Sequence, residues 1–338
     1  MVLIQDYFLA IFFCVCAMIC WGSWANTQKI AAKNWRFELF YWDIIIGILL
    51  MSVIAALTLG SMGTAGGTFL QNINQADGSS VLNAMLSGIL WNTGNLLLVA
   101  AIAVAGMSVA FPIGGGIAWI LGIVINYVVV LMSGNTPSNK PLLLWSGVII
   151  IIIAIYLSGK AYRNLAIEQK KPSLKGILLS VIAGLFIAFF YGVLVRSLDG
   201  TFVSGGRGNL MPFTAIVFFA FGTAIGTIPL NYYFMRHPVE GAPLTMKQYF
   251  SGDIRNHITG ILGGMIWCLG MVCSFMAVGA ASPAIAYGLS NAAPVVAFLW
   301  GFFIWKEFKL ATKNTNTILF IMFILYLIGL VVITISNA

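Results

Sequence analysis

The chain has 338 residues, of which 60% are hydrophobic and only 8% are charged, and its formal net charge is +8. Because an average soluble domain carries about 25% charged residues, this composition excludes a water-soluble globular protein and predicts one embedded in membrane lipid. The lysines and arginines lie in short polar segments between apolar runs. They indicate orientation in a membrane, not a nucleic-acid partner.

Ten segments are long and apolar enough to cross a bilayer, which requires about 20 mostly apolar residues. In chain order they lie near residues 8–28, 39–60, 82–104, 107–132, 141–159, 176–196, 211–234, 257–279, 282–304 and 317–336. We therefore expect an all-α polytopic membrane protein with ten transmembrane helices. The five cysteines all fall within these segments, where we interpret them as small apolar packing residues.

The basic residues are distributed unevenly between the loops. The loops that follow the first, third, fifth, seventh and ninth segments hold 14 of the 17 lysines and arginines, and the exceptions are Lys140, Arg196 and Arg207. Cytoplasmic loops retain lysine and arginine, so this bias predicts a multi-pass protein of the cell membrane with both termini outside the cytoplasm. Residues 160–175 then form a cytoplasmic linker between two sets of five segments.

The third and eighth segments align with each other without gaps, and we call the constant spacing between matched positions the repeat offset. The matched residues are Gly88, Trp91, Gly94 and Ala101 with Gly264, Trp267, Gly270 and Ala277. If each half is one copy of a repeat, its odd number of helices forces the two copies into opposite orientations. We therefore predict two inverted five-helix repeats, residues 1–159 and 176–338, joined by the linker 160–175.

Glycine and proline interrupt the fourth and ninth segments at 106–116 and 279–294. Interruptions at matched places of two repeats predict a binding site near the middle of the membrane, because backbone groups released from a helix there face a cavity. Close helix packing through small residues is the alternative explanation. From the second interruption, we include Tyr287, Ser290 and Asn291 among the predicted solute-binding residues.

An aromatic ring beside two amides lies on the third segment, where Trp91, Asn92 and Asn95 share one helical face. Such a face suits a planar polar solute, since the ring supplies apolar contact and the amides fix orientation. Hydrogen bonding between helices is the alternative role for the amides. The remaining predicted contacts are Trp267, the repeat partner of Trp91, and Trp21 and Asn26 on the first segment.

Asp43 is the one carboxylate among nine that falls clearly within an apolar segment. A charged group at the centre of a bilayer costs about 2.5–3.5 kcal/mol on insertion scales, so such residues are usually functional. We predict that Asp43 binds the coupling proton or cation. The alternative is that it lies just inside the cytoplasmic face and pairs with Arg36 or Lys29.

The sequence shows no pattern typical of catalysis. The two histidines, His237 and His257, fall in or beside a loop, and no metal-ligand spacing or phosphate-binding loop occurs. These observations predict a transporter driven by an ion gradient, without a cofactor or bound metal, rather than an enzyme. They do not indicate an oligomeric state.

Several short motifs resemble the ureide permease family of the drug/metabolite transporter superfamily, whose neighbours include bacterial glucose and rhamnose porters. The motifs are Tyr41-Trp42-Asp43, Gly94-Asn95 and His237-Pro238-Val239, followed by Tyr249. The resemblance implies ten helices with both ends outside, and proton-coupled import of oxo-substituted nitrogen heterocycles such as allantoin and nucleobases. The linker 160–175 is shorter than that of the plant members.

Three other functions stay open at the level of sequence. A sugar symporter fits the neighbouring porters of the family. A drug or metabolite exporter would favour a glutamate deep in the first segment, where this chain has none. A receptor or scaffold that transports nothing would need neither two inverted halves nor interruptions at matched places.

Overall fold

The computed structural model describes residues 1–2, 4–32, 35–62, 67–105, 107–165, 174–199, 208–239, 241–306, 308–309 and 311–338. Regular structure in these ranges is helical, apart from one isolated bridge between Leu198 and Leu210. Ten helical stretches in the described part are long and apolar enough to cross a membrane, which confirms the ten predicted spans.

The first half contains α1 to α7 and the second half contains α8 to α14. The first-half elements are α1 (Tyr7–Ser23), α2 (Asn26–Ile30), α3 (Phe37–Leu57), α4 (Phe69–Gln75), α5 (Gly78–Ala105), α6 (Met107–Met132) and α7 (Pro141–Leu165). The second-half elements are α8 (Leu174–Val195), α9 (Pro212–Arg236), α10 (Met246–Phe250), α11 (Ile254–Ala281), α12 (Pro283–Ser290), α13 (Ala293–Leu299), the π-helix η1 (Trp300–Ile304) and α14 (Lys313–Ile335). The short helices α4 and α10 lie outside the spans.

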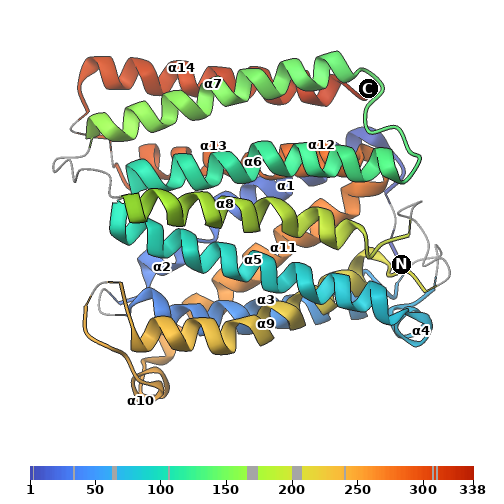
Figure 1. The fold of residues 1–338 in the computed structure, drawn as a ribbon, viewed down its shortest axis with the longest axis horizontal. Helices are drawn as coiled ribbons and strands as arrows, with labels where there is room; N and C mark the ends of the chain where they lie inside the picture. Colours follow the sequence, from blue (N-terminus) through green and yellow to red (C-terminus); the bar gives the residue numbers. More distant parts are fainter. Residues whose placement is uncertain are drawn as a thin grey trace.

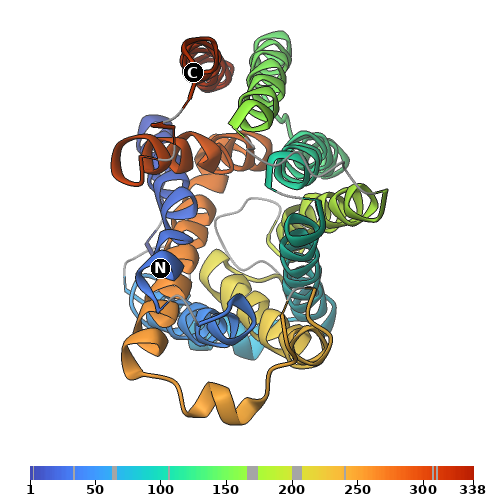
Figure 2. The same cartoon turned by 90° about the vertical axis from the view of Figure 1, so that its left-hand side faces the viewer.

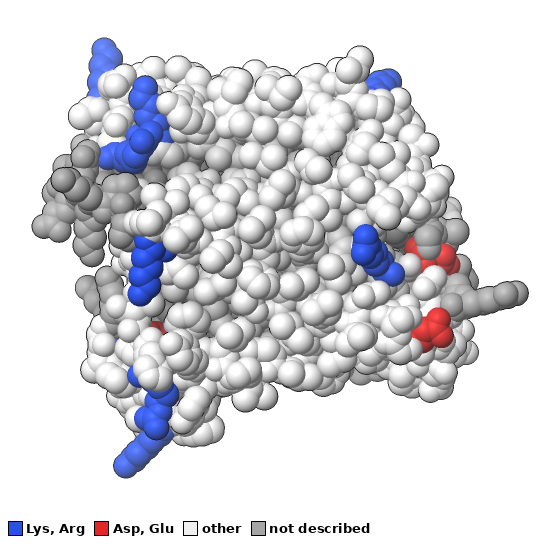
Figure 3. All heavy atoms as spheres, in the orientation of Figure 1, with Lys and Arg blue, Asp and Glu red and all other residues white. Residues whose placement is uncertain are grey.

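The long helices run side by side along the longest axis, and both chain termini lie toward the same end of the bundle (Figure 1). Viewed along the helices, α7 and α14 form a pair outside the other eight spans (Figure 2). Figure 3 shows most of the visible lysines and arginines at the end opposite the termini. We call this end, where α3 begins and α5 and α9 finish, the basic end.

The two halves match at the start of their third spans. The repeat offset, which places Gly88 on Gly264, also relates Gly78, where α5 begins, to Ile254, where α11 begins. This boundary was not used to find the alignment, so its agreement supports the predicted internal repeat.

The packing partners of the matched helices also exchange between the halves. Helix α5 packs on α8 and α9, which are the first two spans of the second half, whereas α11 packs on α1 and α3, the first two spans of the first half. A Cβ atom on Gly88 would lie 2.1 Å from the Phe219 carbonyl oxygen of α9, and one on Gly264 would lie 1.9 Å from the Ile44 carbonyl oxygen of α3. This reciprocity supports the prediction that the halves are inverted copies.

The prediction of two interrupted spans is wrong for the fourth span. Helix α6 continues through Pro112, whereas the ninth span is broken at Asn291 and Ala292, between α12 and α13. One interior proline removes a single backbone hydrogen bond, and α6 is held along its length by close packing on α8. Pro294 instead occupies the first turn of a helix, where proline is favoured, and so begins α13. Gly106, with which the predicted interruption starts, lies outside the described residues, as do residues 166–173 of the linker.

Candidate functional site

An aromatic cluster occupies the middle of the bundle. Trp91 and Trp267 are each the fourteenth of 28 residues in α5 and α11, and their ring centroids lie 4.1 Å apart. Trp267 also stacks on Phe219 of α9, with centroids 5.8 Å apart and an interplanar angle of 14°. Trp21 of α1 stacks on Trp267 at a centroid distance of 6.0 Å and donates a hydrogen bond from Nε1 to the Trp267 carbonyl oxygen. Side chains from four of the ten spans, α1, α5, α9 and α11, thus meet at Trp267.

The rings in this cluster cover one another. Trp21, Trp91 and Trp267 are each less than a tenth exposed, so no aromatic face of these three is left open to a solute in this conformation. The structure brings together these three predicted contacts, and it uses them as a packed aromatic wall at mid-depth.

Next to this wall lies a cluster of neutral polar side chains from α3, α5 and α9. Tyr41 donates its hydroxyl proton to Oδ1 of Asn92 at 2.8 Å, and Thr227 Oγ1 lies 2.9 Å from the same oxygen. Asn95 donates from Nδ2 to the Tyr41 hydroxyl at 3.3 Å. Asn231, one helical turn from Thr227, donates from Nδ2 to the Glu38 carbonyl oxygen at 2.8 Å. We call Tyr41, Asn92, Asn95, Thr227 and Asn231 the amide cluster.

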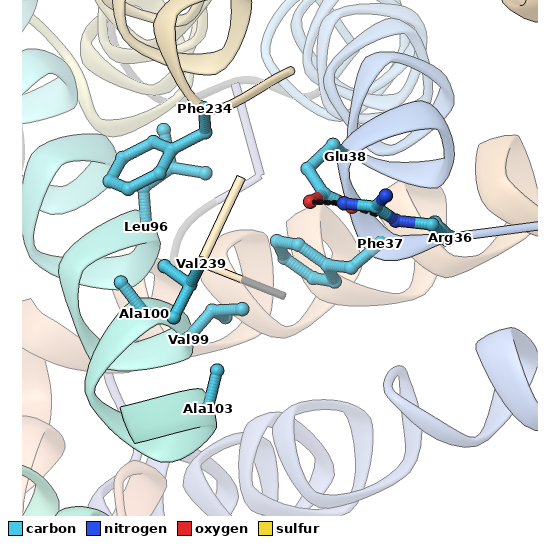
Figure 4. A pocket seen from close by; sticks show the side chains of 9 residues that line it. All are labelled: Arg36, Phe37, Glu38, Leu96, Val99, Ala100, Ala103, Phe234 and Val239. Atoms are coloured by element: carbon cyan, nitrogen blue, oxygen red, sulfur yellow. Dashed lines mark hydrogen bonds and ion pairs between the residues drawn. The ribbon is translucent and has the colours of Figure 1, made fainter. Parts of the chain in front are cut away.

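A cavity of about 210 Å³ lies between the same three helices at the basic end. Figure 4 shows Leu96, Ala100 and Phe234 on one side of it and Phe37 with the Arg36–Glu38 ion pair on the other. Since one water molecule takes up about 30 Å³ of liquid, the space equals roughly seven waters. A small ring compound fits such a volume.

The amide cluster lies about one helical turn beyond the residues that line this cavity. Each lining helix carries a member of the cluster about one turn further inside: Tyr41 follows Phe37 on α3, Asn92 precedes Leu96 on α5, and Asn231 precedes Phe234 on α9. Residues three or four positions apart on a helix share a face. From the basic end inward, the mostly apolar lining of the cavity is therefore followed by the neutral amide cluster and then by the aromatic wall.

Asp43 lies on a different side of α3, where it faces α10 and α11. It is the seventh residue of α3 and is 1% exposed. Its Oδ1 accepts a hydrogen bond from the Tyr249 hydroxyl at 2.7 Å and lies 2.9 Å from Nδ1 of His257. Its Oδ2 is buried without a partner in the described residues. We call Asp43, Tyr249 and His257 the acid cluster.

Aromatic packing encloses the acid cluster. The Trp35 ring stacks on Tyr249 at 6.2 Å and meets the edge of His257 at 5.1 Å. A Cβ atom on Gly260 would lie 2.4 Å from Cβ of Asp43, so α11 can approach the carboxylate only because this residue is glycine. Burial raises the pKa of the Tyr249 hydroxyl above its ordinary value, and the adjacent Asp43 carboxylate raises it further. Tyr249 is therefore a constant hydrogen-bond donor to Asp43.

The alternative partner that we considered for Asp43 is wrong in the case of Arg36. Arg36 forms an ion pair with Glu38 and donates a hydrogen bond to the Ala242 carbonyl oxygen. The Lys29 ammonium lies 4.8 Å from the Trp305 ring centroid. An imidazole takes the place of the expected cation, because the first turn of α11 carries His257 against α3.

Four other predicted solute contacts lie apart from these clusters. Asn26 bonds to Trp305 and to the Ser23 carbonyl oxygen, which ties α2 to the end of η1. Tyr287 donates to the Ala118 carbonyl oxygen and is fully buried against α6, and Ser290 is also fully buried. Asn291 lines a separate cavity of about 40 Å³ between α6, α7, α13 and α14. That volume holds about one water molecule, so these residues are not part of the larger cavity.

Five members of the two clusters carry only a weak signal in the sequence. Thr227 and Asn231 stand four residues apart in the seventh span, a polar pair on one helical face that could have been noticed. Tyr41 is visible only as part of a motif, and Tyr249 and His257 resemble ordinary loop residues. Among the described residues, no three His, Cys, Asp or Glu side chains come together as metal ligands.

Comparison with known proteins identifies the family. The model of the ureide permease family matches residues 40–172 and 163–336, which is most of the chain. The chain belongs to the ureide permease family. It is 24% identical to ureide permease 1 of Arabidopsis thaliana, an alignment that covers 95% of each chain.

Two bacterial relatives are more distant. The glucose uptake protein GlcU of Bacillus subtilis is 24% identical over 79% of this chain and 90% of its own length. The L-rhamnose-proton symporter of Escherichia coli is 26% identical over 73% of this chain and 72% of its own length. Together with the ten spans, the family assignment makes this chain a multi-pass membrane transporter and not an enzyme.

Proposed function

We propose that this protein is a proton-coupled importer of a ureide, nucleobase or other oxo-substituted nitrogen heterocycle. One observation carries the proposal: on one side α3 bears a buried carboxylate next to an imidazole, and on the other side it lines a cavity and carries Tyr41 into the amide cluster, about one turn beyond that cavity. The names of two relatives, ureide permease 1 and the L-rhamnose-proton symporter, support the solute class and the proton.

In this mechanism, Asp43 takes up a proton from the side opposite the basic end and shares it with His257. Protonation removes the charge that burial penalises, so the acid cluster loosens and α3 moves relative to α11. The same movement of α3 shifts Tyr41, so that the amide cluster is exposed first to one side of the membrane and then to the other. Proton and solute are coupled because one helix holds both sites.

Orientation in the membrane follows from charge. The concentration of lysine and arginine at the basic end favours a cytoplasmic position for that end in the cell membrane, with both termini outside. In this conformation the 210 Å³ cavity would face the cytoplasm. A C-terminal alkaline phosphatase fusion should be active and a C-terminal GFP fusion dark; the reverse result would invert the orientation.

The decisive experiment is uptake of radiolabelled allantoin into proteoliposomes with an imposed proton gradient. A gradient equivalent to 100 mV supplies about 2.3 kcal/mol per proton, which drives roughly fifty-fold accumulation of a neutral solute. Asp43→Asn should abolish accumulation while leaving exchange of solute at equal pH. Asp253→Asn is the matched control, because Asp253 is exposed and caps α11 in a role that asparagine also fills. Gradient-driven accumulation that survives Asp43→Asn would remove Asp43 from its role.

A sugar is the second candidate solute, because two relatives carry glucose or rhamnose in their names. The neutral hydrogen-bonding groups of the amide cluster also suit a sugar, which bonds through its hydroxyls. Unlabelled glucose and L-rhamnose, added in excess to the allantoin assay, test this directly. Gradient-driven sugar uptake without allantoin uptake would reassign the substrate.

A further inference from the structure

Two buried polar atoms in the amide cluster have no hydrogen-bond partner among the residues that the structure describes. They are Nδ2 of Asn92, a donor, and Oδ1 of Asn231, an acceptor. Both side chains are completely buried. Because buried polar groups are nearly always paired in folded proteins, one unpaired donor and one unpaired acceptor about one helical turn beyond the lining of the cavity indicate a ligand that supplies the opposite groups.

The existing hydrogen bonds fix which atom each amide leaves free. The Tyr41 hydroxyl accepts a proton from Asn95, so it donates its own to Asn92. The oxygen of Asn92 is therefore engaged and its NH₂ group is left over. Asn231 donates a hydrogen bond from its NH₂ group to the Glu38 carbonyl oxygen, so its own side-chain oxygen is the atom without a partner among the described residues. Both orientations are set by the protein before a solute arrives.

Asn92 and Asn231 are connected through α9 and through α3, the two helices that carry residues bonded to them. Thr227 bonds to Asn92 and stands one turn from Asn231 on α9. Tyr41 bonds to Asn92 and stands one turn from Glu38, whose carbonyl oxygen holds Asn231, on α3. In addition, a Cβ atom on Gly226 would lie only 3.3 Å from Nδ2 of Asn92, so the free donor of α5 sits against α9.

We propose that Asn231 and Asn92 together recognise the amide edge of the solute, an inference that rests on the proposed transport function. Nδ2 of Asn92 donates to a ring carbonyl oxygen, and Oδ1 of Asn231 accepts from the neighbouring ring N–H. The substrate class is then a neutral ring that contains a C(=O)–NH unit. A hydroxyl-only ring such as a sugar presents no fixed donor beside a fixed acceptor and matches this pair less well.

The charges near the cluster agree with a neutral solute. Arg36 and Glu38 pair with each other at the cavity wall, and the members of the amide cluster carry no charge. A solute carboxylate or ammonium group would lose its hydration here without gaining an opposite charge. Asn231 is thus a specificity-determining residue for neutral cyclic amides.

The test is competition against radiolabelled allantoin uptake in proteoliposomes by hydantoin, 1-methylhydantoin and 3-methylhydantoin. Each methyl group removes one ring N–H donor. In the unmodified protein, methylation at the recognised edge should weaken competition about tenfold, as expected for one buried hydrogen bond. In the Asn231→Leu variant, competition by unmethylated hydantoin should weaken by about the same factor. The methylated compound should then compete as well as hydantoin itself, so that the loss of competition caused by methylation, the methylation penalty, disappears.

Asn126→Leu is the matched control. Asn126 is also completely buried, donates within its own helix to the Gly122 carbonyl oxygen, and has an unpaired Oδ1 among the described residues, but it lies on α6. The Asn126→Leu variant should show the same methylation penalty, about tenfold weaker competition, as the unmodified protein. Asn231→Ala, which adds no methyl groups, repeats the measurement if the leucine variant does not fold.

A methylation penalty that persists in Asn231→Leu or Asn231→Ala would overturn the assignment of Asn231 while leaving ureide transport intact. If the unmodified protein responds to neither allantoin nor any hydantoin under a proton gradient, the proposed function fails, and the assignment fails with it.

Discussion

The acid cluster and the amide cluster lie on two sides of the same helix, α3, and differ in every electrostatic respect. The acid cluster joins a carboxylate and an imidazole at 2.9 Å and is closed off by Trp35 and Gly260. The amide cluster contains only neutral groups, leaves one donor and one acceptor unpaired among the described residues, and lies about one turn beyond the lining of a cavity of about 210 Å³. In the proposed mechanism, the acid cluster holds a proton and the amide cluster holds a neutral solute.

This difference teaches how coupling can arise without contact between the two substrates. A proton needs no cavity, only a group whose charge is costly where it stands. A solute needs space and matched hydrogen bonds. Because α3 belongs to both clusters, a shift of that helix changes both sites together. Substitutions confined to one cluster therefore test whether the two are separable.

The largest effect is expected from Gly260→Ala, which inserts a methyl group 2.4 Å from Cβ of Asp43. Helices α3 and α11 must separate to admit it, so we expect more than a hundredfold loss of gradient-driven uptake and about 1–3 kcal/mol of lost stability.

Gly226→Ala is the counterpart at the amide cluster, with its new methyl 3.3 Å from Nδ2 of Asn92. It should alter solute KM and spare coupling. Uptake rates and thermal unfolding of the purified variants measure both effects; a Gly260→Ala protein that accumulates solute normally would contradict the assigned role of the acid cluster.

A smaller effect is expected from His257→Gln, which keeps a hydrogen-bond donor near Asp43 but removes the titratable ring. Proton-driven accumulation should fall about tenfold, the usual scale for loss of a proton-transfer partner, and the dependence of uptake on pH should change shape. Exchange of solute at equal pH should stay within about twofold. His237→Gln is the control, since His237 stacks on Tyr233 at the end of α9, away from Asp43. A pH profile identical to that of the unmodified protein would place His257 outside the coupling mechanism.

The smallest effect is expected from Asn26→Ala. Asn26 bonds to Trp305 and Ser23 and belongs to neither cluster, so only the stability of the α2–η1 contact should suffer, by about 1 kcal/mol. Thermal unfolding should register this loss, while the KM for allantoin stays unchanged. A raised KM at unaltered stability would return Asn26 to the solute site, as the sequence predicts.

Part of the site could be predicted from the sequence because it follows helical periodicity. Trp91 and Asn92 are visible as an aromatic and amide face, Trp267 through the repeat offset, and Asp43 as a charge within an apolar run. Their partners cannot be found in this way, because Thr227, Asn231, Tyr249 and His257 reach the site only through contacts between helices far apart in the chain. Two of these residues resemble ordinary loop residues until α10 and the first turn of α11 are placed against α3.

The sequence by itself determined the membrane class, the ten spans, the bias of basic loops and the alignment of the third span with the eighth, because bilayer thickness and helix geometry act on each segment separately. Only the tertiary structure decided that α6 stays unbroken while α12 and α13 are separated, that the central tryptophans pack on one another, and that Asp43 pairs with His257. These outcomes depend on which helices touch and at what depth. Side chains that complete a site from another helix leave no periodic trace in the segment that receives them.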